Sequence, residues 1–278
     1  MRFVALNVQT LSEFDYDWEQ AVEFLGYYMK SQRIQLLFLS ETHCTGKLDE
    51  VYRTPSGTFR VIASGLDDIH RQGVAFIIEE SLIGQISDVR YSAMEPGRIL
   101  SLDLTATQLY TFVGVYAPAF DVRDRSHSED LQVFGSFLED LVDFVDVTGR
   151  RKVVMGDLNA SMGQVGAGTE SVIGPFGFGT ATDRGTTLLL WCIRTGLFAA
   201  NTCFDIPVND RWSWQSPDAK THKLLDYILV SEDCRDRVQK SGILLDAVVK
   251  SDHRAVVADL FMQHERRNRF VPASNKTT

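Results

Sequence analysis

The sequence lacks several features that would place it in a well-known class of protein. It has no apolar run approaching the roughly 20 residues that cross a bilayer, so we expect no membrane partner. Its beginning, MRFVALNVQT, has neither the long apolar stretch nor the small-residue cleavage site of a signal peptide. Its four cysteines form no C-x-x-C pair, which argues against a structural zinc site and favours reduced thiols in an intracellular protein.

An excess of positive charge is also missing. With 28 basic and 37 acidic residues, the formal net charge of −9 argues against strong non-specific binding of nucleic acid by bulk electrostatics. A site that acts on phosphate would therefore need a local basic groove or a bound cation. Because repeats and low-complexity segments are absent from the body of the chain, we predict one domain over residues 1–262 and a basic, flexible tail or linker start over residues 263–278.

Short apolar runs rich in Val, Ile and Phe make up much of the chain and predict buried strands. They lie at 2–8, 35–41, 59–64, 73–79, 99–104, 109–116, 152–158, 224–230 and 255–261. Apolar residues at helical spacing predict helices elsewhere. The helices are predicted over Trp18–Met29 and Leu131–Val145, with Asp17 and Ser126 as N-caps, and over 186–195, with Gly196 after the end. Many strands with few helices predict an α/β fold in which two mixed β-sheets pack together, flanked by helices.

Polar side chains stand where several of these strands begin or end. They are Asn7, Glu41, Tyr116, Asp157, Asn159, Asp226, Asp252 and His253. Each one alone has an ordinary explanation, because Asp and Asn often form side-chain hydrogen bonds at turns. If the strand ends point the same way, however, all of them converge on one mouth between the sheets. An oxygen-rich set without cysteine suits a hard cation such as Mg²⁺ or Mn²⁺.

Motifs along almost the whole chain, from Asn7 to about Leu260, resemble the endonuclease/exonuclease/phosphatase superfamily. They are LNVQTL, LSETH, VGVYAP, GDLNA, LDYILV and SDHRAV. Within that superfamily the chain most resembles the abasic-endonuclease-like domain of non-LTR retrotransposons and their domesticated relatives. This finer resemblance rests on RQGVAFIIEESL, GDLNASMG, the stretch from Gly177 to Gly185, and RWSWQSPDAKTHKLLDYILV. It implies a DNase I-like fold, a four-layer α/β sandwich.

The resemblance also implies an activity and a role for each matching residue. The activity is divalent-metal-dependent hydrolysis of a phosphodiester in double-stranded DNA, as in target nicking, leaving a 3′-hydroxyl. Mg²⁺ is the implied cofactor and Mn²⁺ its substitute. Glu41, Asn7 and Asp252 would surround the metal; Asp157 would orient or deprotonate the attacking water; Asn159, His253 and Tyr116 would donate to phosphate oxygens; and Asp226 would hold His253. The expected substrate-binding residues are Arg98, Arg184, Ser213, Trp214, Lys220 and His222.

The family further implies a nuclear location and a reverse transcriptase domain as a partner in the same parent polypeptide. Two alternatives stay open at this point. One is a phosphomonoesterase or phosphodiesterase on a phosphoinositide, lipid or nucleotide, which the acidic charge favours over DNA. The other is a non-catalytic, domesticated binding module, which has little support because a competent residue occupies each expected catalytic position.

Overall fold

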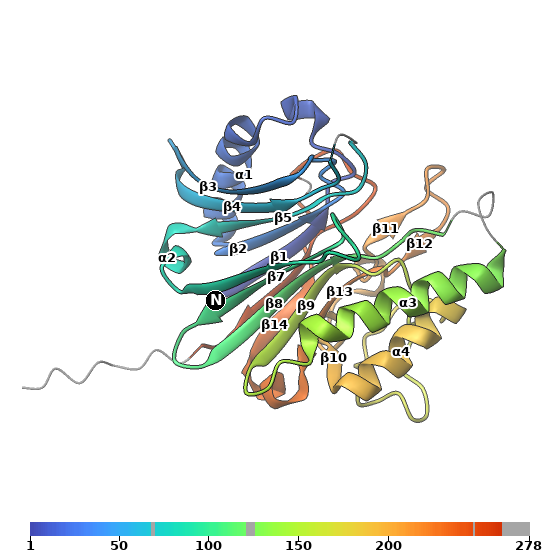
Figure 1. Cartoon of the computed structure of the whole chain (residues 1–278). Coiled ribbons are helices and arrows are strands. Elements are labelled where there is room, and N and C mark those ends of the chain that lie inside the picture. Colours follow the sequence, from blue (N-terminus) through green and yellow to red (C-terminus); the bar gives the residue numbers. More distant parts are fainter. Residues whose placement is uncertain (68–69, 121–125, 247, 263–278) are drawn as a thin grey trace, which may run out of the picture.

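The computed structural model describes residues 1–67, 70–120, 126–246 and 248–262. Two mixed β-sheets pack face to face and helices cover their outer faces, so the predicted α/β sandwich is confirmed (Figure 1). None of the described helices is long and apolar enough to cross a membrane. The predicted tail, residues 263–278, lies outside the described residues, and the domain boundary at residue 262 stays a prediction.

The first sheet has seven strands in the order β14, β15, β1, β2, β5, β4, β3. Their bounds are β1 Arg2–Asn7, β2 Leu36–Ser40, β3 Lys47–Thr54, β4 Gly57–Ser64, β5 Val74–Glu79, β14 Val238–Ile243 and β15 Val256–Leu260. Because β1 is parallel to β2 and antiparallel to β15, the carboxyl ends of β1 and β2 lie beside the amino end of β15. The short helix α2 (Glu80–Ile83) follows β5, and α1 (Trp18–Gln32) packs on the outer face. As predicted, Asp17 caps α1 by accepting a hydrogen bond from the backbone of Glu19.

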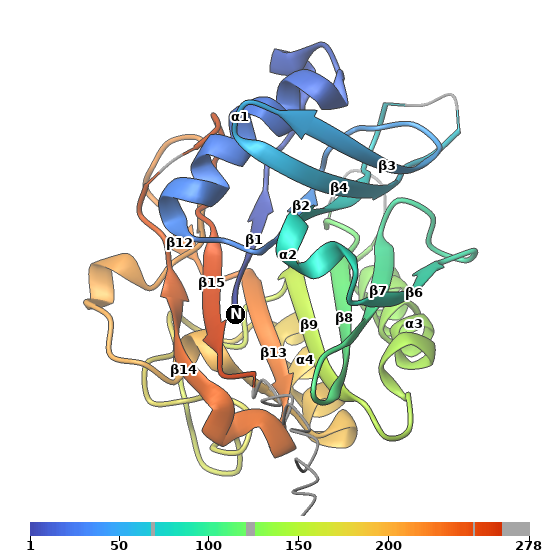
Figure 2. The ribbon, with the colours of Figure 1, turned by 90° about the vertical axis from the view of Figure 1, so that its left-hand side faces the viewer.

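The second sheet has six strands in the order β10, β13, β9, β8, β7, β6. Their bounds are β6 Ile86–Tyr91, β7 Ile99–Thr105, β8 Leu109–Tyr116, β9 Arg151–Asp157, β10 Leu197–Ala199 and β13 Asp226–Ser231. Its outer face is covered by α3 (His127–Val145) and α4 (Asp183–Thr195), on the side of the molecule opposite α1 (Figure 2). Ser126 forms a capping box with Glu129 at the start of α3, and Gly196 ends α4 in the left-handed conformation, as expected. Helix α4 begins at Asp183, earlier than the predicted residue 186.

Four further strands escaped the sequence prediction at sheet edges. These are β3, β6, β10 and β14. Strands β3, β6 and β14 carry many polar side chains, as in KLDEVYRT of β3, so they lack the continuous apolar runs of buried strands. Strand β10 is apolar but has only three residues. The small hairpin of β11 (Trp214–Gln215) and β12 (His222–Lys223) was also missed, because each strand has two residues. Short 3₁₀ turns occupy Ser12–Phe14, Ala200–Thr202, Val208–Asp210 and Glu232–Arg237.

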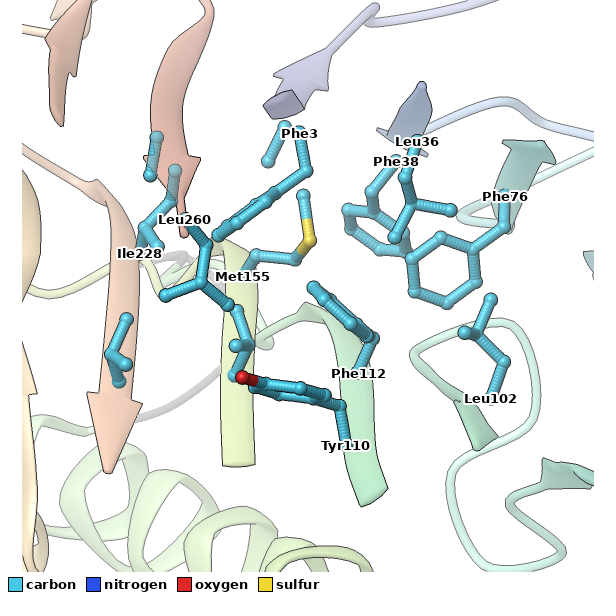
Figure 3. Close-up of a cluster of buried hydrophobic side chains, with 14 of the residues drawn as sticks. Phe3, Leu36, Phe38, Phe76, Leu102, Tyr110, Phe112, Met155, Ile228 and Leu260 are labelled. Atoms are coloured by element: carbon cyan, nitrogen blue, oxygen red, sulfur yellow. The ribbon is translucent and has the colours of Figure 1, made fainter. Parts of the chain in front are cut away.

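The main core lies between the inner faces of the two sheets. Phe3, Phe38 and Phe76 of the first sheet meet Phe112 of the second, and all four are fully buried (Figure 3). The rings of Phe3 and Phe112 pack edge to face with centroids 5.3 Å apart. A side chain at Gly114 would place its Cβ 2.0 Å from the Phe38 ring, so glycine is needed for this close approach. This close-packed layer fixes the relative position of the strand ends of both sheets.

Candidate active site

The register of the second sheet brings three predicted residues side by side. Asp157 is the last residue of β9, and it pairs with Tyr116 at the end of β8 and with Asp226 at the start of β13. Residues opposite each other on neighbouring strands lie about 5 Å apart, so the three side chains share one end of the sheet. The parallel pairing of β8 with β9 and the antiparallel return of β13 produce this grouping.

The first sheet contributes the remaining predicted residues at the same end of the sandwich. Asn7 is the last residue of β1 and pairs with Ser40, the last residue of β2. Glu41 is the next residue after β2. Asp252 and His253 precede β15, whose amino end adjoins the carboxyl end of β1. An open cavity of about 550 Å³ lies over these strand ends. Its lining includes Glu41, Asp157, Asn159, Asp252 and His253.

The amide of Asn7 links the carboxylates of the two sheets. Its Nδ2 donates to Glu41 Oε1 at 2.7 Å and to Asp157 Oδ2 at 3.0 Å, while its Oδ1 accepts from the backbone N–H of Gln9 at 2.9 Å. Ionised carboxylates can only accept hydrogen bonds, so the two acids determine which way the amide points. Asn7 is fully buried, and in this arrangement it orients Glu41 and Asp157.

His253 lies in a buried cluster of acidic groups. Its Nδ1 is 2.8 Å from Asp226 Oδ2, and its Nε2 is 3.9 Å from Asp157 Oδ2. Burial alone would lower the pKa of His253, but the charges of Asp226, Asp157 and Asp252 outweigh burial and raise the pKa to about 10. Burial and repulsion from Asp226 raise the pKa of Asp157 to about 7. At neutral pH the cluster therefore combines a protonated imidazole with an acceptor that exchanges protons in the neutral range.

Tyr116 is held against Arg98 at the edge of this cluster. The Arg98 guanidinium lies 4.9 Å from the centroid of the Tyr116 ring and donates to the Tyr116 carbonyl at 3.2 Å. Burial, together with the charges of Glu41 and Asp157, raises the pKa of Tyr116, so its hydroxyl stays protonated and able to donate. Arg98 also lies 3.7 Å from Glu95, and burial lowers its pKa. The predicted substrate-binding arginine thus packs directly behind the tyrosine.

Three residues that line the cavity have left-handed backbone conformations. The φ angles are 57° for Gln9, 55° for Glu41 and 46° for Asn159. Such conformations cost of order 1–3 kcal/mol each in residues other than glycine, and they concentrate at functional sites. At Asn159 hydrogen bonds offset the cost, because its N–H donates to Asp157 Oδ1 at 2.8 Å and its Nδ2 to Ala117 O at 2.9 Å. The surrounding structure therefore holds these side chains in conformations that the backbone alone disfavours.

The donor atoms at this site fit a hard divalent cation. Asp252 Oδ2 accepts from Trp214 Nε1 at 2.9 Å, while Asp252 Oδ1 is buried and has no hydrogen-bond partner among the described residues. Asp157, Asp226 and His253 also offer ligand atoms within 4.8 Å of one another. In that second set the ring nitrogen Nδ1 of His253 is already engaged with Asp226 Oδ2, 2.8 Å away. Glu41 and Asp252 also line the cavity, and carboxylate oxygens are the ligands that Mg²⁺ prefers.

Arg184, a predicted substrate-binding residue, belongs instead to the scaffold of the site. It is only 6% exposed, and its Nε and Nη2 donate to the two oxygens of Asp130 on α3. Its Nη1 donates to Pro118 O at 2.6 Å and to Asn159 O at 3.4 Å. Arg184 lines the cavity, but its guanidinium already donates hydrogen bonds to Asp130, Pro118 and Asn159, which belong to three separate segments. The structure therefore argues against direct binding of substrate by Arg184.

Ser213 was also predicted to bind substrate, but in the structure the residue is fully buried. Its Oγ accepts from the backbone N–H groups of Leu225 and Asp226, both at 3.0 Å. The hydroxyl thereby holds the start of β13, where Asp226 meets His253. Its contribution to the site is structural and indirect.

The β11–β12 hairpin carries the other three predicted substrate-binding residues. Trp214 lines the cavity together with Lys223, whose Nζ lies 5.7 Å from the Trp214 ring centroid. Lys220 lies in the turn of the hairpin with 82% of its side chain exposed. His222 stacks on Trp212 with ring centroids 4.3 Å apart. The structure therefore brings Trp214 to the cavity, and places Lys220 and His222 further along the hairpin.

The far wall of the cavity was not foreseen from the sequence. It includes Phe120, His127 and Asp183, and the last two are the first residues of α3 and α4. His127 Nε2 lies 2.7 Å from Asp183 Oδ2, which joins the two helix starts. No strand-end pattern marks these residues, because they reach the cavity through the packing of the helices on the second sheet.

Two packed mixed sheets with acids, amides, a tyrosine and a histidine at one end define a DNase I-like sandwich. The model of the Endonuclease/Exonuclease/phosphatase family matches residues 8–253. The chain therefore belongs to this family, as its motifs predicted.

Several known proteins are similar to the chain in sequence or in fold. Craniofacial development protein 2 of Tragulus javanicus is 27% identical over 228 residues, which are 81% of this chain and 37% of that protein. The chain thus spans little more than a third of the length of this curated relative. An AP endonuclease from Archaeoglobus fulgidus superposes with a TM-score of 0.65 at 16% identity, covering 94% of this chain and 100% of the other. The endonuclease domain of TRAS1, a telomere-specific non-LTR retrotransposon, gives 0.60 at 16% identity, covering 94% and 99%. These structures confirm the predicted DNase I-like fold.

Proposed function

We propose that the chain is a divalent-metal-dependent endonuclease that hydrolyses a phosphodiester of double-stranded DNA and leaves a 3′-hydroxyl. One observation carries the proposal. Carboxylates, an amide and an imidazole line a single cavity: they come from Glu41 after β2, from Asp157 and Asn159 at the end of β9, and from Asp252 and His253 before β15. Asn7 of β1 and Asp226 of β13 hold them from behind through hydrogen bonds. A phosphodiester is already anionic and gains charge in the transition state, so its hydrolysis requires this combination of cation, acceptor and donors.

In this proposal Glu41 and Asp252 hold Mg²⁺, for which Mn²⁺ can substitute. When bound, the ion neutralises charge on the phosphate and lowers the pKa of water. Asn7, predicted from the sequence to surround the metal, instead orients Glu41 and Asp157 through its Nδ2. Asp157 accepts a proton from the attacking water or orients it, and its raised pKa of about 7 suits this exchange near neutral pH.

Hydrogen-bond donors of the site stabilise the charge that develops on the reacting phosphate. Protonated His253 donates through Nε2, and Asp226 holds the ring through Nδ1. Asn159 donates through the second hydrogen of its Nδ2, since the first is bonded to Ala117 O. Tyr116 donates its hydroxyl. Removing one such donor typically lowers a rate by about 10²–10³-fold.

A plasmid assay tests the proposal. Supercoiled plasmid incubated with the protein and Mg²⁺ or Mn²⁺ should be nicked, and EDTA should abolish nicking. Asp157→Asn should remove the activity with little change of shape. Asp236→Asn is the matched control, because Asp236 is exposed in the turn at the other end of β13 and should retain full activity.

The products decide between the proposed function and its alternatives. Ligatable 3′-hydroxyl ends at the nick support the endonuclease. Release of inorganic phosphate from phosphomonoesters without nicking would favour the phosphatase alternative. A folded protein that turns over neither kind of substrate would favour a binding module. By family resemblance we also propose a nuclear location and a reverse transcriptase domain in the parent polypeptide, to be checked by cell fractionation and by sequencing the full transcript.

A further inference from the structure

The carboxylate of Asp252 is held on one side only. Its Oδ2 accepts from the indole N–H of Trp214 at 2.9 Å. Its Oδ1 is buried without a hydrogen-bond partner among the described residues and lies 3.8 Å from His253 Nε2. The ion pair with His253 is too long for a hydrogen bond, so this buried carboxylate oxygen keeps an acceptor position for a further ligand.

The strand that carries Trp214 is tied to the same segment through its backbone. Gln215 N donates to Asp252 O at 3.0 Å, and Arg254 N donates to Ser213 O at 2.7 Å. Trp214 and His253 are paired in an isolated antiparallel β-bridge. These backbone hydrogen bonds hold the segment of Trp214 beside the segment of Asp252. The hydrogen bond from Nε1 to the carboxylate therefore joins two side chains whose backbones are fixed relative to each other.

We propose that Trp214 is a positioning residue for the metal. Its indole N–H donates a hydrogen bond to Asp252 Oδ2. This bond leaves Oδ1 as the ligand atom of the carboxylate and directs it toward the cation. The inference rests on the metal site proposed above. It also changes the role of Trp214, which the sequence suggested as a contact for DNA: the indole ring borders the cavity, but its N–H serves the carboxylate. Partners of this kind set ligand orientation and basicity, and their loss typically lowers metal affinity about 10–100-fold.

Isothermal titration of the apo protein with Mn²⁺, in the absence of DNA, tests the inference without relying on activity. Trp214→Phe keeps an aromatic ring in place and removes the N–H donor. Trp212→Phe is the matched control, because the Trp212 ring packs against other residues. The guanidinium carbon of Arg254 lies 3.3 Å from its centroid, and the centroid of the His222 ring lies 4.3 Å away. We expect Trp214→Phe to weaken Mn²⁺ binding about 10-fold or more, and Trp212→Phe to leave it within about twofold.

A double-mutant cycle shows whether Trp214 acts through Asp252. In an Asp252→Ala background, Trp214→Phe should cause no further loss of Mn²⁺ affinity. Equal losses in both backgrounds would overturn the inference, as would wild-type affinity in Trp214→Phe. If that variant has a lower melting temperature without metal, Trp214→Leu repeats the comparison with a smaller side chain. A wild-type protein that binds no Mn²⁺ would overturn the proposed metal site itself. Equal Mn²⁺ affinity of the wild type and Trp214→Phe would overturn the role of Trp214 alone.

Discussion

The buried ion pair of Arg184 and Asp130 allows the scaffold role of Arg184 to be separated from substrate binding. Their side chains are 7% and 2% exposed, and two of the guanidinium nitrogens donate to the carboxylate. Arg184→Met removes this partner from a buried carboxylate. Breaking a buried pair in this way costs about 3–5 kcal/mol. Because a domain is stable by only about 5–15 kcal/mol, the variant should lose a large part of its stability.

Urea denaturation of three variants measures this effect. Arg184→Met should show a much lower midpoint, and the double variant Arg184→Met with Asp130→Leu should recover part of the loss, since apolar replacement of a whole buried pair is often close to neutral. The recovery is partial because the carbonyls of Pro118 and Asn159 lose their guanidinium donor in both variants. Arg194→Met is the control. It breaks a 2.8 Å pair with Glu139 whose side chains are 54% and 64% exposed, so it should cost below about 1 kcal/mol. Equal losses in Arg184→Met and Arg194→Met, or no recovery in the double variant, would refute the reasoning.

Three other predictions concern the site. Millimolar Mn²⁺ or Mg²⁺ should raise the melting temperature, because a cation relieves repulsion among the acids of the cavity; no change in a thermal scan would contradict the proposed metal site. Asp226→Asn should shift the basic limb of the kcat/KM profile to lower pH, because His253 donates only while protonated and loses one of the three carboxylate charges that together raise its pKa to about 10. An unshifted limb would remove His253 from the proposed mechanism. Gly185→Ala should destabilise the protein by about 1–3 kcal/mol in urea, because the new Cβ would meet Ser161 O at 1.7 Å; wild-type stability would show that α4 can move freely.

The sequence predicted the layers of the fold because the central strands are buried on both faces. A strand such as β2, with five buried residues in LLFLS, is a continuous apolar run and is recognisable without its neighbours. An edge strand such as β3 has only exposed and half-buried residues, and its pairing with β4 depends on contacts that the sequence does not display. Helix starts were predictable at Asp17 and Ser126, since capping depends on neighbouring residues alone.

For the candidate site too, features that depend on the local sequence were predictable and features that depend on distant contacts were not. Residues at the ends of buried strands were predictable, because the strand pattern itself locates them. Burial of individual polar residues was not. Arg184 looks like an ordinary surface cation in the sequence, and its partner Asp130 lies 54 residues earlier on another helix. Ser213 likewise appears as an exposed hydroxyl in a polar loop until Leu225 and Asp226 are seen to donate to it.

The charge of the site connects metal binding with the choice of substrate. Glu41, Asp157, Asp226 and Asp252 bring up to four negative charges around one imidazolium, in a protein whose formal charge is already −9. Without a cation this cluster repels phosphate, and burial together with the charge of Asp226 raises the pKa of Asp157. A divalent cation therefore has two effects: it relieves repulsion within the protein and reverses the potential that the substrate meets. Metal and phosphate should consequently bind cooperatively, each raising the affinity of the other by the same factor.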